Sequence, residues 1–261
     1  MNSDSRMTAI ESKAQHLLRL RNVSFSYLEG VETLHNINLD LAPSEFHCLI
    51  GRSGCGKTSL LKLAAGLLSA QQGEVVWNNQ LLITPQSDMG FVFQRPTLLE
   101  WLNVLDNVLL PIALHRRIET SDLQKAKELL QRMGLGNKFD DKPTELSGGQ
   151  QSRVAIARAL ITSPRILFMD EPFASLDAIT REELQHDLMA ICAEHKTSIL
   201  FETHDIGEAV YLGNQVSVMA QGKIHHTLAI DLPQPRQNSM RHSPEFNHFS
   251  AKLRHAMEVV A

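Results

Sequence analysis

The sequence predicts an α/β fold, with a mostly parallel β-sheet that carries helices on both faces. Two observations lead to this prediction. Short apolar segments alternate with helical segments along residues 165–220, a pattern typical of parallel strands joined by helices. Between Gln94 and Leu146 the chain changes to helical character, which predicts an inserted helical subdomain over about residues 95–160.

The N-terminal part predicts an antiparallel β subdomain. Residues 1–17 are polar and are expected to form a leader outside the fold. Alternating side chains over residues 18–27 predict a first strand, and residues 33–41 predict a second. Glu29-Gly30 between them is typical of a turn, so the two strands are expected to run antiparallel.

The next elements surround a glycine-rich loop. A buried strand over residues 45–50 runs into this loop, and apolar residues at helical spacing predict a helix over residues 57–68. Two further strands are expected at residues 73–79 and 90–93.

Within the helical insertion, residues 121–133 have helical spacing, with Ser121 as the expected N-cap. A second helix over residues 149–160 is expected to stop before Pro164. After it, the chain is predicted to continue as strand, helix, strand, helix and strand, over residues 165–170, 179–194, 198–203, 206–212 and 215–220.

The main domain is predicted to span residues 18–228. Beyond it, residues 229–261 are expected to form a linker, marked by Pro233 and Pro235, and a C-terminal helix. Ser243 followed by a proline is typical of a helix cap and first turn, so this helix is expected to run to about residue 259.

Composition restricts the class of protein. A formal net charge of −4 and a pI near 6.3 argue against binding to nucleic acid or anionic lipid through bulk charge. No apolar run approaches the roughly 18 residues of a membrane span, and residues 1–13 lack the apolar core of a signal peptide. Cys48, Cys55 and Cys192 form no disulfide or zinc pattern. We therefore expect the chain to remain in the cytoplasm.

The glycine-rich loop GRSGCGKT fits the pattern G-x-x-x-x-G-K-[ST], and it lies between a predicted strand and a predicted helix. Backbone N–H groups of such a loop close on phosphates, helped by the partial positive charge of the helix N-terminus. Lys57 is expected to reach the β- and γ-phosphates and Thr58 to bind Mg²⁺. The predicted ATP-binding residues here are Gly51, Arg52, Ser53, Gly54, Cys55, Gly56, Lys57, Thr58 and Ser59.

Two carboxylates, Asp170 and Glu171, end an apolar strand. A surface pair is the alternative, but the apolar residues 166–169 predict a buried strand whose end points at a ligand crevice. Asp170 is expected to hold Mg²⁺ through water, and Glu171 to polarise the attacking water as a catalytic base.

A second glycine-rich turn, Leu146-Ser147-Gly148-Gly149-Gln150, precedes the carboxylate strand by one helix. Alone it could be a plain N-cap. Together with the phosphate loop and the carboxylate strand, and in this order along the chain, the motifs resemble those of the ATP-binding-cassette (ABC) ATPases. The resemblance extends from about Arg19 to about Leu228. The resemblance implies a P-loop NTPase core, ATP hydrolysis with ATP and Mg²⁺, and a homodimer or a pair with a close relative.

The resemblance also implies roles for single residues. Tyr27 matches the aromatic residue that stacks on adenine, although Phe25 is a rival for that role. Gln94 matches the glutamine that senses the γ-phosphate and binds Mg²⁺. His204 matches the catalytic switch histidine, with a buried core histidine as the alternative.

Other matching residues are expected to serve the partner subunit. In the family the signature of one subunit caps the γ-phosphate bound by the other. Carried over, Ser147, Gly148, Gly149 and Gln150 form the partner-site signature, and Asp177 belongs to the loop 175–177 that crosses the dimer interface.

Two positions depart from the family pattern, and a third residue, Cys55, suggests a chemical hypothesis. Ser152 replaces a longer polar side chain, and Glu100 replaces a residue that is often proline. Cys55 lies in the phosphate loop, where the helix terminus is expected to lower the thiol pKa and make the thiol reactive. The alternative is that Cys55 is a small filler residue.

Two functions compete for an ATP-driven pair of such domains. The first is the energy-coupling subunit of a membrane importer, peripheral on the cytoplasmic face of the inner membrane. Its partners are then a second ATPase subunit, an integral membrane permease and a periplasmic or lipid-anchored solute-binding protein, with no nucleic acid. The second is a soluble cassette protein that acts on nucleic acid or ribosomes, but these usually carry two cassettes or coiled-coil insertions.

The segment 94–108 favours the importer. In the family this region forms the groove for the permease's coupling helix, and its Leu-Leu-x-Trp-Leu-x-Val-Leu-Asp-Asn-Val run is similar to the nitrate, sulfonate and taurine importers, a group with thiamine-precursor systems. Residues 178–184 are also similar to those of this importer group. The alternative is that these apolar residues pack the helical subdomain. The expected solute is therefore a small anion or an organosulfur or nitrogen compound.

Overall fold

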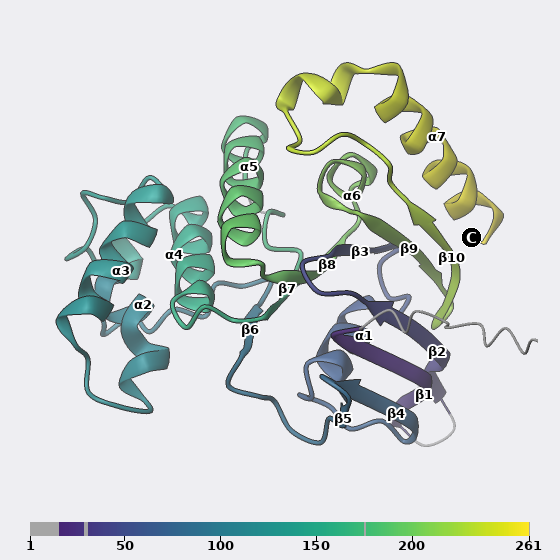
Figure 1. The fold of residues 1–261 in the computed structure, drawn as a ribbon, viewed down its shortest axis with the longest axis horizontal. Coiled ribbons are helices and arrows are strands. Elements are labelled where there is room, and N and C mark those ends of the chain that lie inside the picture. Colours follow the sequence, from purple (N-terminus) through teal and green to yellow (C-terminus); the bar gives the residue numbers. More distant parts are fainter. Residues whose placement is uncertain (1–15, 29–30, 175, 261) are drawn as a thin grey trace, which may run out of the picture.

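The computed structural model describes residues 16–28, 31–174 and 176–260, and two sheets organise them (Figure 1). The larger sheet has the strand order β10-β9-β3-β8-β7-β6 and is parallel apart from β10. The smaller sheet has the order β2-β1-β4-β5 and is antiparallel. The predicted α/β fold with a mostly parallel sheet and an N-terminal antiparallel sheet is therefore confirmed.

The strands of the larger sheet are β3 (Phe46–Gly51), β6 (Met89–Val92), β7 (Ile166–Asp170), β8 (Ser198–Thr203), β9 (Gln215–Ala220) and β10 (Lys223–Ala229). The strands of the smaller sheet are β1 (Leu18–Leu28), β2 (Val31–Leu41), β4 (Gln72–Trp77) and β5 (Gln80–Leu81). The helices are α1 (Lys57–Ala64), α2 (Val104–Ala113), α3 (Thr120–Arg132), α4 (Gly148–Leu160), α5 (Ala178–His195), α6 (Ile206–Leu212) and α7 (Pro244–Val259), with short 3-10 turns η1 (Pro143–Glu145) and η2 (Asn238–His242).

Two hydrophobic cores lie on opposite faces of the larger sheet. Because side chains of a strand alternate between faces, β8 sends Ile199 and Phe201 into one core and Leu200 into the other. The core around Leu200 also holds α1 and the inner face of the smaller sheet, so α1 lies between the two sheets. The other core holds residues of α2 to α7. Because β7 and β8 run parallel to β3, which ends at the glycine-rich loop, the carboxyl ends of these strands lie at the same edge of the sheet as that loop.

The helical insertion consists of α2, α3 and α4, which lie together at one side of the molecule (Figure 1). The sequence predicted helical character between Gln94 and Leu146 but gave no bounds for α2, which contains Pro111. Asn103 caps α2 by accepting the Asp106 N–H at 2.7 Å. The predicted N-cap of α3, Ser121, is wrong, since the helix begins one residue earlier and the Asp122 carboxylate accepts the N–H of Glu119 at 2.9 Å.

The chain between Gly222 and the C-terminal helix packs against the rest of the described structure. Residues 223–229 pair with β9 as strand β10, and Ile230 and Leu232 are buried in the core. Arg236 is buried as well, and its guanidinium donates to the backbone carbonyls of four residues, Val210, Tyr211, Gly213 and Ile230. The predicted final helix is confirmed as α7, capped by Ser243 and packed against α6 and β9 (Figure 1).

Among the described helices, none combines the length and the apolar character that crossing a membrane requires.

Candidate active site

The glycine-rich loop connects the end of β3 to the start of α1, as its sequence context predicts. Gly56 caps α1 in the left-handed region, with φ of 103°. A Cβ atom at this position would lie 2.8 Å from a methyl group of Leu34 and 3.0 Å from the carbonyl oxygen of Thr33. Only glycine therefore fits. The first N–H groups of α1 have no partner within the helix, which suits this turn to binding an anion.

Lys57 and Thr58 extend from the first turn of α1 into a cavity of about 280 Å³. The buried Lys57 ammonium donates to the carbonyl oxygens of Gly51 and Arg52, at 3.0 and 3.2 Å. The Thr58 hydroxyl lies 3.5 Å from a carboxylate oxygen of Asp170. The cavity is lined by Thr33, Ser53, Gly54, Gly56, Lys57, Thr58, Ser59, Gln94, Asp170, Glu171 and Glu202.

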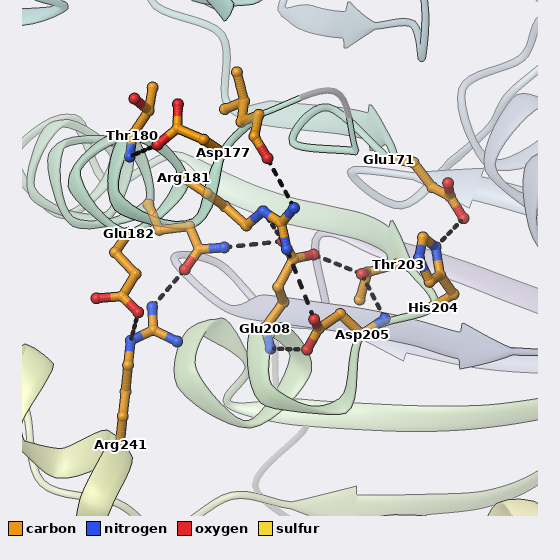
Figure 2. Close-up of polar contacts among 12 residues, drawn as sticks. Glu171, Asp177, Thr180, Arg181, Glu182, Thr203, His204, Asp205, Glu208 and Arg241 are labelled. Carbon is orange, nitrogen blue, oxygen red and sulfur yellow. Dashed lines mark hydrogen bonds and ion pairs between the residues drawn. The ribbon is translucent and has the colours of Figure 1, made fainter.

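Three of the predicted residues meet around Glu171. Nδ1 of His204 lies 3.0 Å from one Glu171 carboxylate oxygen, and the Gln94 amide donates to the other at 3.4 Å. Figure 2 shows His204 turned toward Glu171. The His204 side chain is 63% exposed, which excludes the alternative of a buried core histidine. Glu171 has a φ of 42°, and such strained backbone is often found at functional sites.

Sequence reasoning missed Glu202, which lies beside Asp170 in the register of β8 and β7. Glu202 accepts a hydrogen bond from the Thr58 hydroxyl at 2.9 Å and lies 3.6 Å from the Lys57 ammonium. Burial, and next the nearby Asp170 charge, raise the pKa of Glu202 to about 7. Burial also raises the pKa of Asp170. The available signal was an acidic residue inside the otherwise apolar strand before His204.

The second glycine-rich turn forms the N-terminus of α4. The Ser147 hydroxyl accepts the Gln150 N–H at 3.2 Å, and the Gln150 side chain accepts the Ser147 N–H at 2.9 Å, which is a capping box. A Cβ at Gly148 would meet nothing within 4 Å, so this residue faces open space. A hollow of about 510 Å³ is lined by residues of this turn and by Asp177. It shares no lining residue with the cavity at Lys57.

Comparison with known families agrees with this geometry. The family model described as ABC transporter matches residues 34–174, more than half of the chain. The chain belongs to the ABC transporter family. It is accordingly an ATP-binding protein and an ATPase.

Individual relatives cover most of this cassette. It is 44% identical over 215 residues to the aliphatic sulfonates import ATP-binding protein SsuB of Bacillus subtilis, covering 82% of each chain. It is 40% identical over 237 residues to the bicarbonate transport ATP-binding protein CmpD of Synechocystis sp., covering 88% of this chain and 84% of the relative. A solved cassette, MJ0796, dimeric and bound to ADP and phosphate, is 31% identical with a TM-score of 0.75, covering 83% of this chain and 100% of that chain.

The two aromatic candidates for stacking on adenine differ in exposure within the cassette. Phe25 is buried, whereas Tyr27 is 57% exposed and meets the Phe25 ring edge-on. The Ser59 hydroxyl, in the first turn of α1, donates to the Tyr27 hydroxyl at 3.2 Å. Tyr27 therefore has a free aromatic face beside the phosphate loop, and it is the better candidate of the two.

The expected low pKa of Cys55 is wrong. Burial raises the pKa of its thiol, and this effect exceeds the opposing influence of the Lys57 charge. Cys55 lines a cavity of about 250 Å³ together with Met257 and Val260 at the end of α7. The filler alternative is the one the structure supports, because desolvation disfavours the thiolate.

Asp177 and Ser152 both have local partners. Asp177 caps α5 by accepting the Thr180 N–H at 3.0 Å, and this bond lowers the pKa of the carboxyl. Its neighbour Ser175 lies outside the described residues. The Ser152 hydroxyl is buried and donates to the carbonyl oxygen of Gly148 at 3.1 Å. The short side chain is therefore satisfied within α4.

A buried polar network joins the strand that precedes His204 to the C-terminal part of the cassette (Figure 2). The Thr203 hydroxyl donates to Glu208 at 2.6 Å, and the Gln185 amide donates to the same carboxylate at 3.0 Å. Arg241 in turn donates to the Gln185 carbonyl oxygen. The network connects α5, which follows Asp177, to α6, which follows His204.

Proposed function

We propose that the cassette is the ATP-hydrolysing, energy-coupling subunit of a membrane importer and that it works as a pair. One observation carries the pairing. The phosphate loop and the signature turn line two separate cavities of one protomer, about 280 and 510 Å³ in volume. A second copy related by a two-fold axis would bring each loop opposite the partner's signature. Ser147 keeps its hydroxyl proton available for a phosphate, because the oxygen is the atom engaged in the cap.

The residues around Lys57 fit a Mg²⁺–ATP complex. Mg²⁺ prefers oxygen ligands, and the cavity offers the Thr58 hydroxyl, the Asp170 carboxylate and the Gln94 amide oxygen. These three residues would hold the ion, which supplies charge neutralisation at the phosphates. Residues 51–59 would close on the phosphate chain, and Tyr27 would stack on the base.

Glu171 and His204 would carry out the chemical step. Glu171 is the general base that takes a proton from the attacking water, at the end of a buried strand that fixes its position. His204, whose Nδ1 lies 3.0 Å from Glu171, would orient this carboxylate, and its other ring nitrogen would contact the γ-phosphate. Hydrolysis in the pair would then be coupled to opening and closing of the two cassettes.

The loop before α2 supports docking of a permease. Trp101, which lies in this loop, is 72% exposed. The buried Asn107 side chain fixes the loop, because it accepts the Leu99 N–H at 2.8 Å and donates to the Leu99 and Asn103 carbonyl oxygens at 3.1 and 2.9 Å. An exposed aromatic side chain on a rigid loop is a good anchor for a partner helix. The partner we propose is an integral membrane permease, which would hold the cassette at the cytoplasmic face of the inner membrane.

The relatives support a small anion as the transported solute. SsuB is named for aliphatic sulfonates and CmpD for bicarbonate, and both solutes are small anions. We extend this class to the present system, with nitrate as a further anion, and we keep taurine and thiamine precursors as candidates outside it. A periplasmic or lipid-anchored binding protein would select the solute. The relatives do not favour the alternative of a soluble cassette acting on nucleic acid or ribosomes.

The first experiment is a tagged pull-down from gently solubilised membranes, with partners identified by mass spectrometry. We expect a multi-span permease and a second cassette. A Trp101→Ala protein should lose the permease but keep ATPase activity, whereas a matched exposed change away from the loop, Leu81→Ala, should keep both. Recovery of ribosomes or nucleic acid in place of a permease would refute the importer.

A further inference from the structure

Glu202 places an additional carboxylate in the cavity beside the phosphate loop. On the face of the sheet that contacts α1, Phe168 of β7 and Leu200 of β8 belong to the core beside that helix. Asp170 and Glu202 lie two residues further along the same strands. Because side chains two residues apart lie on the same face of a sheet, both face α1. Glu202 is only 4% exposed. The strand therefore delivers a buried acidic side chain to the residues that begin α1.

The contacts of Glu202 are with the two side chains that a nucleotide needs. Its carboxylate accepts the Thr58 hydroxyl at 2.9 Å, closer than the 3.5 Å between that hydroxyl and Asp170. Its other oxygen lies 3.6 Å from the Lys57 ammonium. A phosphate chain that reached Lys57 and Thr58 would therefore have to displace the Glu202 carboxyl group from both.

The charge balance of this cavity is unfavourable for a bare polyphosphate. Three carboxylates, Asp170, Glu171 and Glu202, line it with a single ammonium, that of Lys57. Negative charges held together at a buried site disfavour binding of a further anion, and the effect is strong where water is excluded. A divalent cation between the carboxylates and the phosphates reverses this repulsion.

We propose that Glu202 is a specificity-determining residue of the nucleotide site, which competes with the phosphate chain for Lys57 and Thr58 and so restricts binding to the metal complex of the nucleotide. The proposal rests on the proposed binding of ATP at the phosphate loop. It assigns to Glu202 the rejection of metal-free nucleotide, a role separate from those of Asp170 and Glu171.

The test is equilibrium binding of a fluorescent ATP analogue to the purified full chain at pH 8, above the Glu202 pKa of about 7, once with excess Mg²⁺ and once with EDTA. We expect Glu202→Gln, which keeps the shape of the side chain and an acceptor for Thr58, to bind the metal-free analogue about tenfold more tightly than the wild type. Binding of the Mg²⁺ complex should change less, so the ratio of the two affinities should shrink by a similar factor.

Two further variants keep the test decisive. Glu202→Val also removes the charge and suits a strand, so it replaces the glutamine variant should that one fail to fold. Glu208→Gln is the matched control, since Glu208 is a buried carboxylate outside the cavity and its variant should keep the wild-type ratio. A ratio in both Glu202 variants within twofold of the wild type, or an equal loss of both affinities, would overturn the proposal.

The same measurement separates this inference from the proposed function. If the wild type does not bind the Mg²⁺ complex at all, ATP binding at the loop is itself wrong. If the wild type binds it, Lys57→Ala abolishes binding, and the Glu202 variants keep the wild-type ratio, only the inference about Glu202 fails.

Discussion

The shared nucleotide site can be tested by mixing two inactive proteins. Lys57→Ala removes the ammonium from the phosphate loop but leaves the signature turn intact. Ser147→Arg does the opposite: the exposed Ser147 lies beside the open space at Gly148, so a long cationic side chain would fill the hollow that would face the partner in the proposed pair. Loss of the cap at α4 should cost about 1 kcal/mol, which the folded domain can tolerate.

The expected activity follows from the two cavities. In a mixed pair, one site joins the intact loop of the Ser147→Arg subunit to the intact signature of the Lys57→Ala subunit, and the other site is defective twice. Random equimolar mixing makes about half of the pairs mixed, so independent sites should restore about a quarter of the wild-type rate in a two-fold assembly.

The assay is steady-state phosphate release by each variant alone and by the mixture, at concentrations where the wild type pairs. Each variant alone should be inactive. A mixture that stays inactive, while both subunits still bind nucleotide or pair with wild-type partners, would refute independent shared sites. Full activity in either variant alone would refute the sharing of sites altogether.

The remaining predictions concern single residues. Glu171→Gln should keep ATP binding and lower turnover by about 10²-fold to 10⁴-fold, because the general base is lost; a normal rate of phosphate release would remove Glu171 from that role, and ATP should trap the variant as a dimer in gel filtration. Arg236→Ala should lower the free energy of unfolding by about 4 kcal/mol, since four buried carbonyl oxygens lose a charged donor. Its melting temperature should fall by about 10 °C in a thermal scan, whereas the exposed Arg254→Ala should change little. In EDTA, the wild type should lose stability relative to Glu202→Gln as pH rises from about 5 to 8. The sign follows from linkage: the folded state holds the Glu202 proton up to a pKa of about 7 while the unfolded state releases it near its ordinary value. Parallel melting curves over that pH range would contradict this.

Much of the site was predictable because its chemistry requires fixed residue types at fixed spacing. The loop ending in Lys57-Thr58 needs its glycines for backbone geometry, and Gly56 indeed adopts a φ of 103°. The apolar run before Asp170 and Glu171 predicted a buried strand end, which is where β7 places them. These are local properties, and local sequence determines them.

Other features were unpredictable for physical reasons. Strand β10 lies at the edge of the larger sheet and its residues are mostly exposed, so its pattern carries little signal, and it forms by pairing with β9. The position of Arg236 depends on four carbonyl groups from other segments. The pKa of Cys55 depends on a competition between burial and charge that only three-dimensional packing decides.

The sequence by itself determined the family, the nucleotide chemistry and the residues of the phosphate loop, because each rests on a contiguous motif. Only the tertiary structure decided which carboxylate contacts Thr58, since Asp170 and Glu202 become neighbours through the parallel pairing of β7 with β8. It also separated the signature turn from the phosphate loop into two cavities. The physical reason is that side chains distant in sequence acquire their charge environment and their partners only when the strands that carry them are packed together.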